Sequence, residues 1–293
     1  MYTDFFGLHE KPFSLTPDTS LFLNEQSHRD ALNTMLLALK HCEGFIKVVG
    51  EVGTGKTLLG RILLSRLGYD FLSVYIPNPF MTAEELKYYV AKEVGADIEK
   101  AMASHEVLSA LYRRLVQHAR NGKHVVLIVD EAQAMPRDTI ECLRLLTNLE
   151  TEKRKLLQIV MLGQPELDHV LNRTDLRQLK QRIVFSEYLK PFSLGGARRY
   201  VVHRIKSTQK NSKEIFTPSA LTLVAIASGG IPRLINILCH KSLICAYGRG
   251  NMKVGLWHVS KAILDTDGSR LSSRLVSMIL RLTLFKPRTE HAL

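Results

Sequence analysis

The sequence is poor in cysteine, in tryptophan and in long apolar segments. Its 293 residues include 4 cysteines and 1 tryptophan, and the cysteines form no close C-x-x-C pair. This pattern argues against a zinc site or a disulfide framework and favours buried, inert thiols in a reducing compartment. No stretch reaches roughly 18 uninterrupted apolar residues, and the first residues lack the basic leader and apolar run of a secretory signal. We therefore expect a cytosolic protein with no membrane span.

Acidic residues are scarce in the C-terminal third. Residues 190–293 contain 17 Lys and Arg against 4 Asp and Glu, whereas residues 1–189 contain 23 against 24. The net charge of +12 therefore originates after residue 189. Such asymmetry predicts an acidic partner for that third, whether nucleic acid, an anionic membrane surface or an acidic protein face.

Apolar runs alternate with helical patterns through the first two thirds. Runs rich in Val, Ile and Leu, with little alternation, predict strands that are covered on both faces. They lie at residues 45–50, 71–76, 125–129, 157–162 and, shorter and more polar, 183–188. Helical patterns separate them at 57–67, 83–93, 105–120 and 137–150. The alternation predicts a parallel five-stranded α/β sandwich.

After Pro191 the pattern is helical only. Helices are expected at 195–209, 218–228, 232–247 and 256–265, with Thr217 as the N-cap before Pro218. We expect an α/β domain at 1–189, a helical domain at 190–268 and an amphipathic basic tail at 269–293.

The tail carries a helical pattern at 271–285. Arg274 and Arg281 are seven residues apart and share one helix face, while leucines occupy the other. The segment is too short and too charged to span a bilayer. It predicts a helix packed on the helical domain or on a neighbouring subunit, or one lying on an anionic membrane surface.

A glycine-rich loop follows the first predicted strand. The loop reads Gly50-Glu51-Val52-Gly53-Thr54-Gly55-Lys56-Thr57, which fits G-x-x-x-x-G-K-[ST], and Leu58 continues into a helical pattern. Its backbone N–H groups and the helix N-terminus would point at a phosphate. Lys56 would reach the β- and γ-phosphates, and the Thr57 hydroxyl would bind Mg²⁺. The loop predicts a nucleoside triphosphate site.

Two acids follow the third predicted strand. Asp130 would lie near the Mg²⁺ bound by Thr57, and Glu131 could polarise a water for attack on the γ-phosphate. An acidic pair at a strand end is often merely solvated, but it is far more specific when it follows a phosphate loop. We predict that both residues are catalytic.

Two amides follow other strands, each beside a proline. Gln164 would lie at the carboxyl edge of the sheet, where a γ-phosphate sensor is useful. Asn78 could restrain Glu131 until a partner arrives. Because Asn and Gln beside proline also make ordinary turns, each has a structural alternative.

Three arginines are candidates for charge stabilisation. Arg182, first choice, and Arg177, second, precede the fifth strand, and either could reach a neighbouring subunit's nucleotide as an arginine finger. The alternative is a solvated basic helix face. Arg233 follows Gly230-Ile231-Pro232 at a helix start, from which it could bring a cation over the phosphates; the alternative is an exposed arginine at an ordinary helix start.

Together these motifs resemble an AAA+ ATPase with a helical lid. Several short sequence motifs are more narrowly similar to those of ExeA/GspA-type ATPases, and the resemblance covers residues 1–265. These motifs are Phe6-Gly7-Leu8, Lys11-Pro12-Phe13, Thr16-Pro17-Asp18, Asp130-Glu131-Ala132-Gln133, Leu162 to Leu167 and Leu176-Arg177-Gln178-Leu179. The resemblance implies ATP and Mg²⁺ as cofactors. It also implies that Pro12, Phe13 and Pro17 lie by the adenine, with His28 beside them.

The resemblance also implies a setting. Secretion members carry a membrane span and a peptidoglycan-binding part, whereas this sequence stops at Leu293 without either, as do short members tied to the mannose-sensitive haemagglutinin (MSHA) type IV pilus. Implied partners are further copies of the chain and inner-membrane pilus or secretion assembly proteins, with a cytoplasmic location that could be peripheral to the inner membrane. One alternative is a DNA-binding ATPase that regulates transposition, because ATPases of that kind share these sequence motifs. The other is a nucleotide-dependent scaffold with little turnover.

Overall fold

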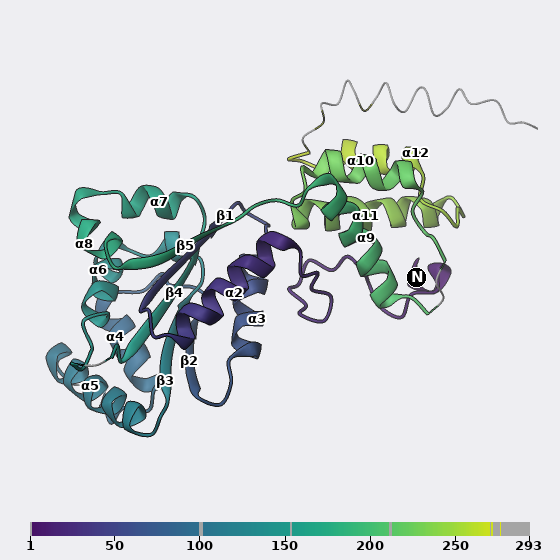
Figure 1. The fold of residues 1–293 in the computed structure, drawn as a ribbon. Coiled ribbons are helices and arrows are strands. Elements are labelled where there is room, and N and C mark those ends of the chain that lie inside the picture. Colours follow the sequence, from purple (N-terminus) through teal and green to yellow (C-terminus); the bar gives the residue numbers. More distant parts are fainter. Residues whose placement is uncertain are drawn as a thin grey trace, which may run out of the picture. The chain divides into compact units, whose positions relative to one another are not determined.

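The chain forms two compact units in the computed structural model (Figure 1), which describes residues 2–99, 102–152, 154–210, 213–269, 271 and 276. One unit, the sheet unit, comprises residues 26–52 and 56–190. The other, the helical unit, comprises residues 1–25, 53–55 and those from 191 onward. The N-terminal 25 residues, expected with the α/β domain, thus group with the helices.

A five-stranded parallel sheet forms the centre of the sheet unit. The strands are β1 (Phe45–Gly50), β2 (Phe71–Ile76), β3 (His124–Val129), β4 (Leu157–Gly163) and β5 (Ile183–Leu189). Their order is β2-β3-β4-β1-β5, and every pairing is parallel. The predicted fold class is confirmed, and each predicted strand lies within one residue of its observed bounds.

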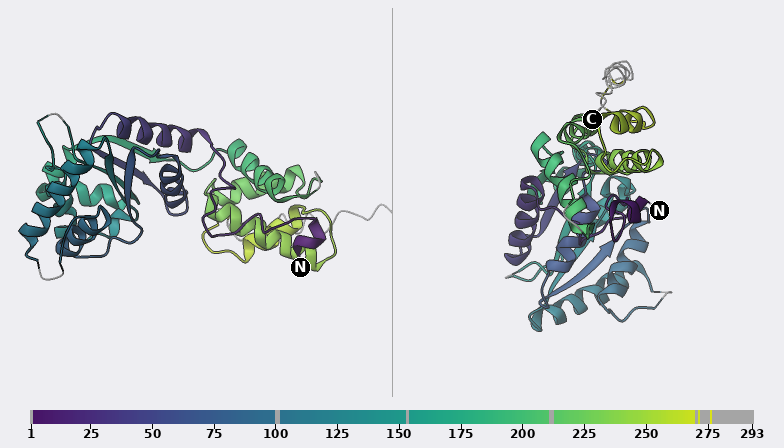
Figure 2. Two further views of the ribbon diagram at one scale, coloured as in Figure 1. Left: turned by 90° about the horizontal axis from the view of Figure 1, so that it is seen from below. Right: turned by 90° about the vertical axis from the view of Figure 1, so that its right-hand side faces the viewer.

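Helices cover both faces of this sheet (Figure 2). They are α2 (Gln26–Lys40), α3 (Lys56–Arg66), α4 (Ala83–Glu93), α5 (Ser104–Arg120), α6 (Arg137–Leu146), α7 (Glu166–Leu171) and α8 (Arg177–Lys180), with 3-10 turns η1 (Ala132–Ala134) and η2 (Thr174–Leu176). Helices α4 to α8 share one core with alternate residues of β1, β3 and β4. Helices α2 and α3 contact each other and β1. Burial on both faces explains why the strands read as continuous apolar runs.

The helical unit contains the predicted helices after residue 190. They are α9 (Leu194–Thr208), α10 (Pro218–Ser228), α11 (Pro232–Gly248) and α12 (Leu256–Leu264), together with α1 (Tyr2–Phe6). Thr217 caps α10 as predicted, since its hydroxyl accepts a hydrogen bond from Ala220 N at 3.2 Å. The expected tail helix at 271–285 lies outside the described residues, apart from Leu271 and Val276.

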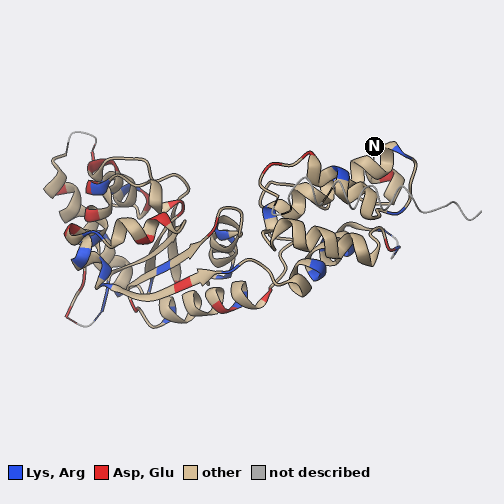
Figure 3. Ribbon diagram, turned by 90° about the horizontal axis from the view of Figure 1, so that it is seen from above, with Lys and Arg blue, Asp and Glu red and all other residues tan. Residues whose placement is uncertain are grey.

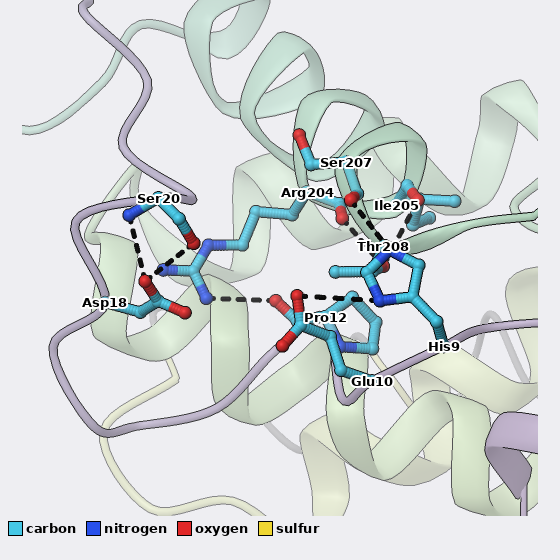
Figure 4. Close-up of polar contacts among 9 residues, drawn as sticks. All are labelled: His9, Glu10, Pro12, Asp18, Ser20, Arg204, Ile205, Ser207 and Thr208. Carbon is cyan, nitrogen blue, oxygen red and sulfur yellow. Dashed lines mark hydrogen bonds and ion pairs between the residues drawn. The ribbon is translucent and has the colours of Figure 1, made fainter.

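The N-terminal segment is held on α9 by hydrogen bonds (Figure 4). Arg204 is 3% exposed, and its Nη1 donates to Pro12 O at 2.9 Å. His9 N donates to Thr208 O at 2.9 Å. Phe13 is 2% exposed and meets Phe216 edge-on, with ring centroids 6.2 Å apart. The segment therefore contributes to the helical core, and this packing explains the shifted boundary.

The four cysteines are free thiols. Cys142 and Cys239 are buried, and burial raises the pKa of the Cys142 thiol to about 11. Cys42 and Cys245 are half-buried, so the expectation of four fully buried thiols was right for two of them. None of the helices in the described ranges has the length and apolarity needed to cross a membrane.

Gly230, before α11, tests the packing of the helical unit. Its φ is +76°, and a Cβ there would lie 2.0 Å from Phe192 O. Gly250 has a similar φ of +69° but nothing within 4 Å of its Cβ position. We expect Gly250→Ala to lower the free energy of unfolding by about 1 kcal/mol through backbone strain alone. We expect Gly230→Ala to cost roughly 3 kcal/mol or more, because the clash is added.

Denaturant unfolding followed by fluorescence of Trp257 measures this difference, because the only tryptophan of the chain lies in α12 of the same unit. Equal losses for the two variants would contradict the packing assigned to Gly230.

Candidate nucleotide site

The loop between β1 and α3 has the backbone shape that the motif requires. β1 ends at Gly50 and α3 begins at Lys56. Gly53 and Gly55 have φ angles of +81° and +100°, which L side chains rarely adopt. The first turn of α3 leaves backbone N–H groups without intrahelical partners, and these groups together with the helix dipole favour an anion.

Lys56 is enclosed by this loop. Its side chain is buried, and its ammonium donates to Gly50 O at 2.7 Å and to Glu51 O at 3.1 Å. Burial lowers the pKa of Lys56, and the negative charges of Glu131 and Asp130 oppose this effect. Thr57 and Leu58 are half-buried in the first turn of α3. The hydroxyl of Thr57 and the carboxylate of Asp130 are the hard oxygen donors that suit Mg²⁺.

Asp130 directly follows β3 and is 2% exposed. Tyr75 Oη donates to its Oδ2 at 3.0 Å, and Glu131 N donates to its Oδ1 at 2.9 Å. Burial and the neighbouring Asp130 charge raise the pKa of Tyr75 to about 12. Tyr75 therefore remains a donor and holds the carboxylate in place; its role was not foreseen because a tyrosine in a strand ordinarily indicates packing.

Glu131 has a left-handed backbone, with φ 50° and ψ 39°. For a residue with a Cβ this conformation costs about 1–2 kcal/mol, and such strain concentrates at functional sites. Its Oε2 accepts hydrogen bonds from Gln133 Nε2 at 2.6 Å and from Gln164 Nε2 at 2.9 Å. Burial alone would raise the pKa of Glu131, but these two bonds and the Lys56 charge outweigh burial and lower it. The carboxylate is therefore ionised at neutral pH.

The two glutamines are joined to each other. Gln133 Oε1 accepts a hydrogen bond from Gln164 N at 2.9 Å. Gln164 lies just after β4, at the carboxyl edge of the sheet as predicted, and it contacts Glu131. Its role as a phosphate sensor stays a prediction. Gln133, in η1, was not assigned a role from the sequence, and only its position two residues after Glu131 could have suggested one.

Asn78 occupies a turn. Its Oδ1 accepts a hydrogen bond from Phe80 N at 3.2 Å, as in the alternative for an Asn beside proline. Among the described residues, the Glu131 carboxylate accepts side-chain hydrogen bonds from Gln133 and Gln164. Restraint of Glu131 by Asn78 stays a prediction.

The arginines before β5 lie at the other edge of the sheet. Because β1 and β5 are parallel, Arg182 precedes β5 at the edge opposite the loop that follows β1. The seven residues of β5 separate those edges by roughly 20 Å. Arg182 Nη1 donates to Thr147 Oγ1 at 2.8 Å, and Arg177 is exposed at the start of α8. Neither arginine can reach the loop of its own chain.

Predicted site residues outside the loop also belong to the helical unit. Arg233 is exposed in the first turn of α11. Phe13 lies in the core, so its ring has a packing role, and Pro12 O is bonded to Arg204. The expected contacts of Pro12, Phe13 and Arg233 with a nucleotide stay predictions.

Comparison with known proteins assigns the fold. The sequence profile of the AAA domain family matches residues 40–171. Residues 40–171 therefore resemble the AAA domain family. Over 270 residues, which are 92% of this chain, the sequence is 40% identical to general secretion pathway protein A of Aeromonas hydrophila. The chain spans about half of that relative, 49% of its length. These matches support an ExeA/GspA-type AAA+ protein.

Solved structures agree on the fold. The ORC2 protein of Aeropyrum pernix has a TM-score of 0.67 and 15% identity, and the match covers 92% of this chain and 75% of that one. Cdc6p of Pyrobaculum aerophilum has a TM-score of 0.67 and 17% identity, and the match covers 90% of this chain and 73% of that one. The RuvB branch migration motor of Thermotoga maritima has a TM-score of 0.54 and 15% identity, and the match covers 81% of this chain and 68% of that one. The chain therefore has the AAA+ fold.

The paired glutamines predict a measurable effect on Glu131. Gln133→Leu and Gln164→Leu should each raise the pKa of Glu131, because each removes an N–H donor that stabilises the ionised form. Carbon-13 NMR titration of the glutamate carboxyls measures this shift. Gln117→Leu, on the outer helix α5, is the matched control and should leave the pKa unchanged. An unaltered Glu131 pKa in both site variants would contradict the hydrogen bonds described.

Proposed function

We propose that the chain binds and hydrolyses ATP. The observation that carries the proposal is the ionised Glu131, held by Gln133 and Gln164 and close enough to Lys56 for their charges to shift each other's pKa. A carboxylate fixed in this way can accept a proton from an attacking water. Its lowered pKa keeps it in the basic form throughout the neutral range.

The other site residues would bind the phosphates and Mg²⁺ and orient the carboxylates. Residues Gly50 to Thr57 would bind the phosphates through backbone N–H groups and the Lys56 ammonium. The Thr57 hydroxyl and the Asp130 carboxylate would hold Mg²⁺, which neutralises phosphate charge when bound. Tyr75 keeps Asp130 oriented. Gln164 would move between Glu131 and the γ-phosphate, so that the base is released when nucleotide is in place.

Arg182 supports a shared site. Since it lies at the sheet edge opposite its own loop, a catalytic role requires a neighbouring copy of the chain. We propose a homo-oligomer in which Arg182, or Arg177 as the alternative, completes the site of the next subunit. A cation supplied in trans stabilises charge in the transition state of phosphoryl transfer.

The setting is proposed from the relative. Its name, general secretion pathway protein A, favours a role beside a type II secretion-like apparatus at the cytoplasmic side of the inner membrane. More narrowly, the chain would act like MshM in assembly of an MSHA type IV pilus. A second candidate is a DNA-binding regulator of transposition, which the charge excess of residues 190–293 favours. Pilus or secretion genes beside this gene favour the first role, and transposase genes the second.

Removing the base should separate binding from hydrolysis. Glu131→Gln keeps the shape of the side chain and one oxygen that can accept the bonds from Gln133 and Gln164, so we expect ATP to bind with near-normal affinity. Hydrolysis should fall about 100-fold or more, because proton acceptance is lost. Lys56→Ala should instead lose binding, as measured with a fluorescent ATP analogue. Hydrolysis by Glu131→Gln at the normal rate would overturn the assignment of the base.

Mixing two inactive variants tests the shared site. Arg182→Ala retains an intact loop and Lys56→Ala an intact Arg182, so adjacent copies form some complete sites. We expect each variant alone to be inactive and the mixture to recover part of the ATPase activity. Thr147→Val removes the hydrogen-bond partner of Arg182 without removing the cation, and it should stay active. A mixture with no recovery would exclude Arg182 and direct the same experiment to Arg177.

A further inference from the structure

The outer face of α9 borders two adjoining cavities in the helical unit. One has a volume of about 510 Å³ and the other about 290 Å³. Arg198, Val202 and Lys206 of α9 and Leu221 of α10 line both. Leu23 completes the first cavity. The two cavities form one continuous surface, the α9 groove, along the helix.

Charge and apolar area alternate along this groove. Arg198, Val202 and Lys206 are four residues apart, which places them on one helix face at intervals of about 6 Å along the axis. The two cations are exposed, Val202 is half-buried and Leu221 is 9% exposed. The groove therefore presents an apolar floor between two separated positive charges.

Its cations are available to a ligand. Of the basic residues on its rim, Arg199 is already neutralised, since it donates two hydrogen bonds of 2.8 Å to Glu25. Within the described ranges Arg198 and Lys206 form no ion pair. Lys213 adds a third exposed cation beside the smaller cavity, and Glu214 is the acidic residue there. Figure 3 shows the basic and acidic positions of this unit.

This combination selects one class of occupant. A nucleic acid backbone would match the cations but would leave the apolar floor of Val202, Ile205 and Leu221 unused. A peptide helix with an apolar stripe flanked by acids matches both features. We propose that the α9 groove binds an acidic amphipathic segment of a partner protein, with apolar side chains on the floor and carboxylates at Arg198 and Lys206.

Peptide binding tests the proposal on the full chain without nucleotide, so its outcome does not depend on ATP hydrolysis. The probe is a fluorescein-labelled, helix-forming peptide of about 15 residues, with Leu at every third or fourth position and Glu beside it. The control peptides are a scrambled peptide of identical composition and a peptide in which Lys replaces each Glu. Fluorescence anisotropy should show binding of the first peptide and weaker binding of the other two.

Charge reversal locates the site. The double variant Arg198→Glu/Lys206→Glu should weaken binding about tenfold or more, since two attractions become repulsions. The matched control Lys11→Glu/Lys253→Glu changes the net charge equally at exposed positions of the same unit that line neither cavity, and it should bind normally. Val202→Ser should weaken binding several-fold at unchanged charge. Trp257 fluorescence confirms that each variant is folded.

Five results would overturn the proposal. The first four are absence of binding at low salt, equal binding of the scrambled peptide, equal loss in the control variant, and tighter groove-dependent binding of a DNA duplex of about 20 base pairs. A fifth is self-association by sedimentation that disappears in Arg198→Glu/Lys206→Glu, which would assign the groove to a second copy of the chain.

Discussion

The parallel pairing of β1, β4 and β3 is the constraint on which the candidate site depends. Because these strands run in one direction, their carboxyl ends meet at a single edge of the sheet. Residues distant in the sequence, Lys56, Asp130 and Gln164, are thereby brought together. The strands hold this register because their side chains are buried on both faces, so a shift of one residue would misplace every contact.

Charge balance at this edge follows from that placement. A buried ammonium is costly in isolation, and Lys56 is retained because the loop carbonyls accept its hydrogen bonds and two carboxylates face it. The Glu131 pKa is lower in the folded chain than its ordinary value, so ionised Glu131 contributes stability above the ordinary glutamate range, and the contribution is lost as pH falls through the lowered pKa. The strained backbone at Glu131 offsets part of this contribution. A residue kept in that conformation by two glutamines can be released by a ligand that competes for either one.

The sequence predicted the strands and the loop well because both signals are local. Continuous Val, Ile and Leu runs indicate buried parallel strands, and the loop motif fixes its own backbone shape. The contact of Gln133 with Glu131 was not predicted, because it arises from a 3-10 turn that directs the Gln133 amide back to Glu131. Phe13 illustrates the other difficulty. An apolar residue near the N-terminus predicts burial, but the sequence does not indicate which of two cores receives it.

The chain passes from one unit to the other at residues 25–26, 52–53, 55–56 and 190–191, and hydrogen bonds within each unit lie close to the first and last of these positions. In the sheet unit Lys190 N donates to Ser27 Oγ at 3.0 Å, which holds the exit of β5 beside the start of α2. In the helical unit the guanidinium of Arg199 is bonded to Glu25, one residue before α2 begins. The middle of the phosphate loop, residues 53–55, groups with the helical unit, whereas Lys56, Asp130 and Glu131 belong to the sheet unit. Within the helical unit Arg233 N donates a hydrogen bond to Gly53 O at 3.2 Å. Packing on the start of α11, and not continuity of the chain, therefore assigns these three loop residues to the helical unit.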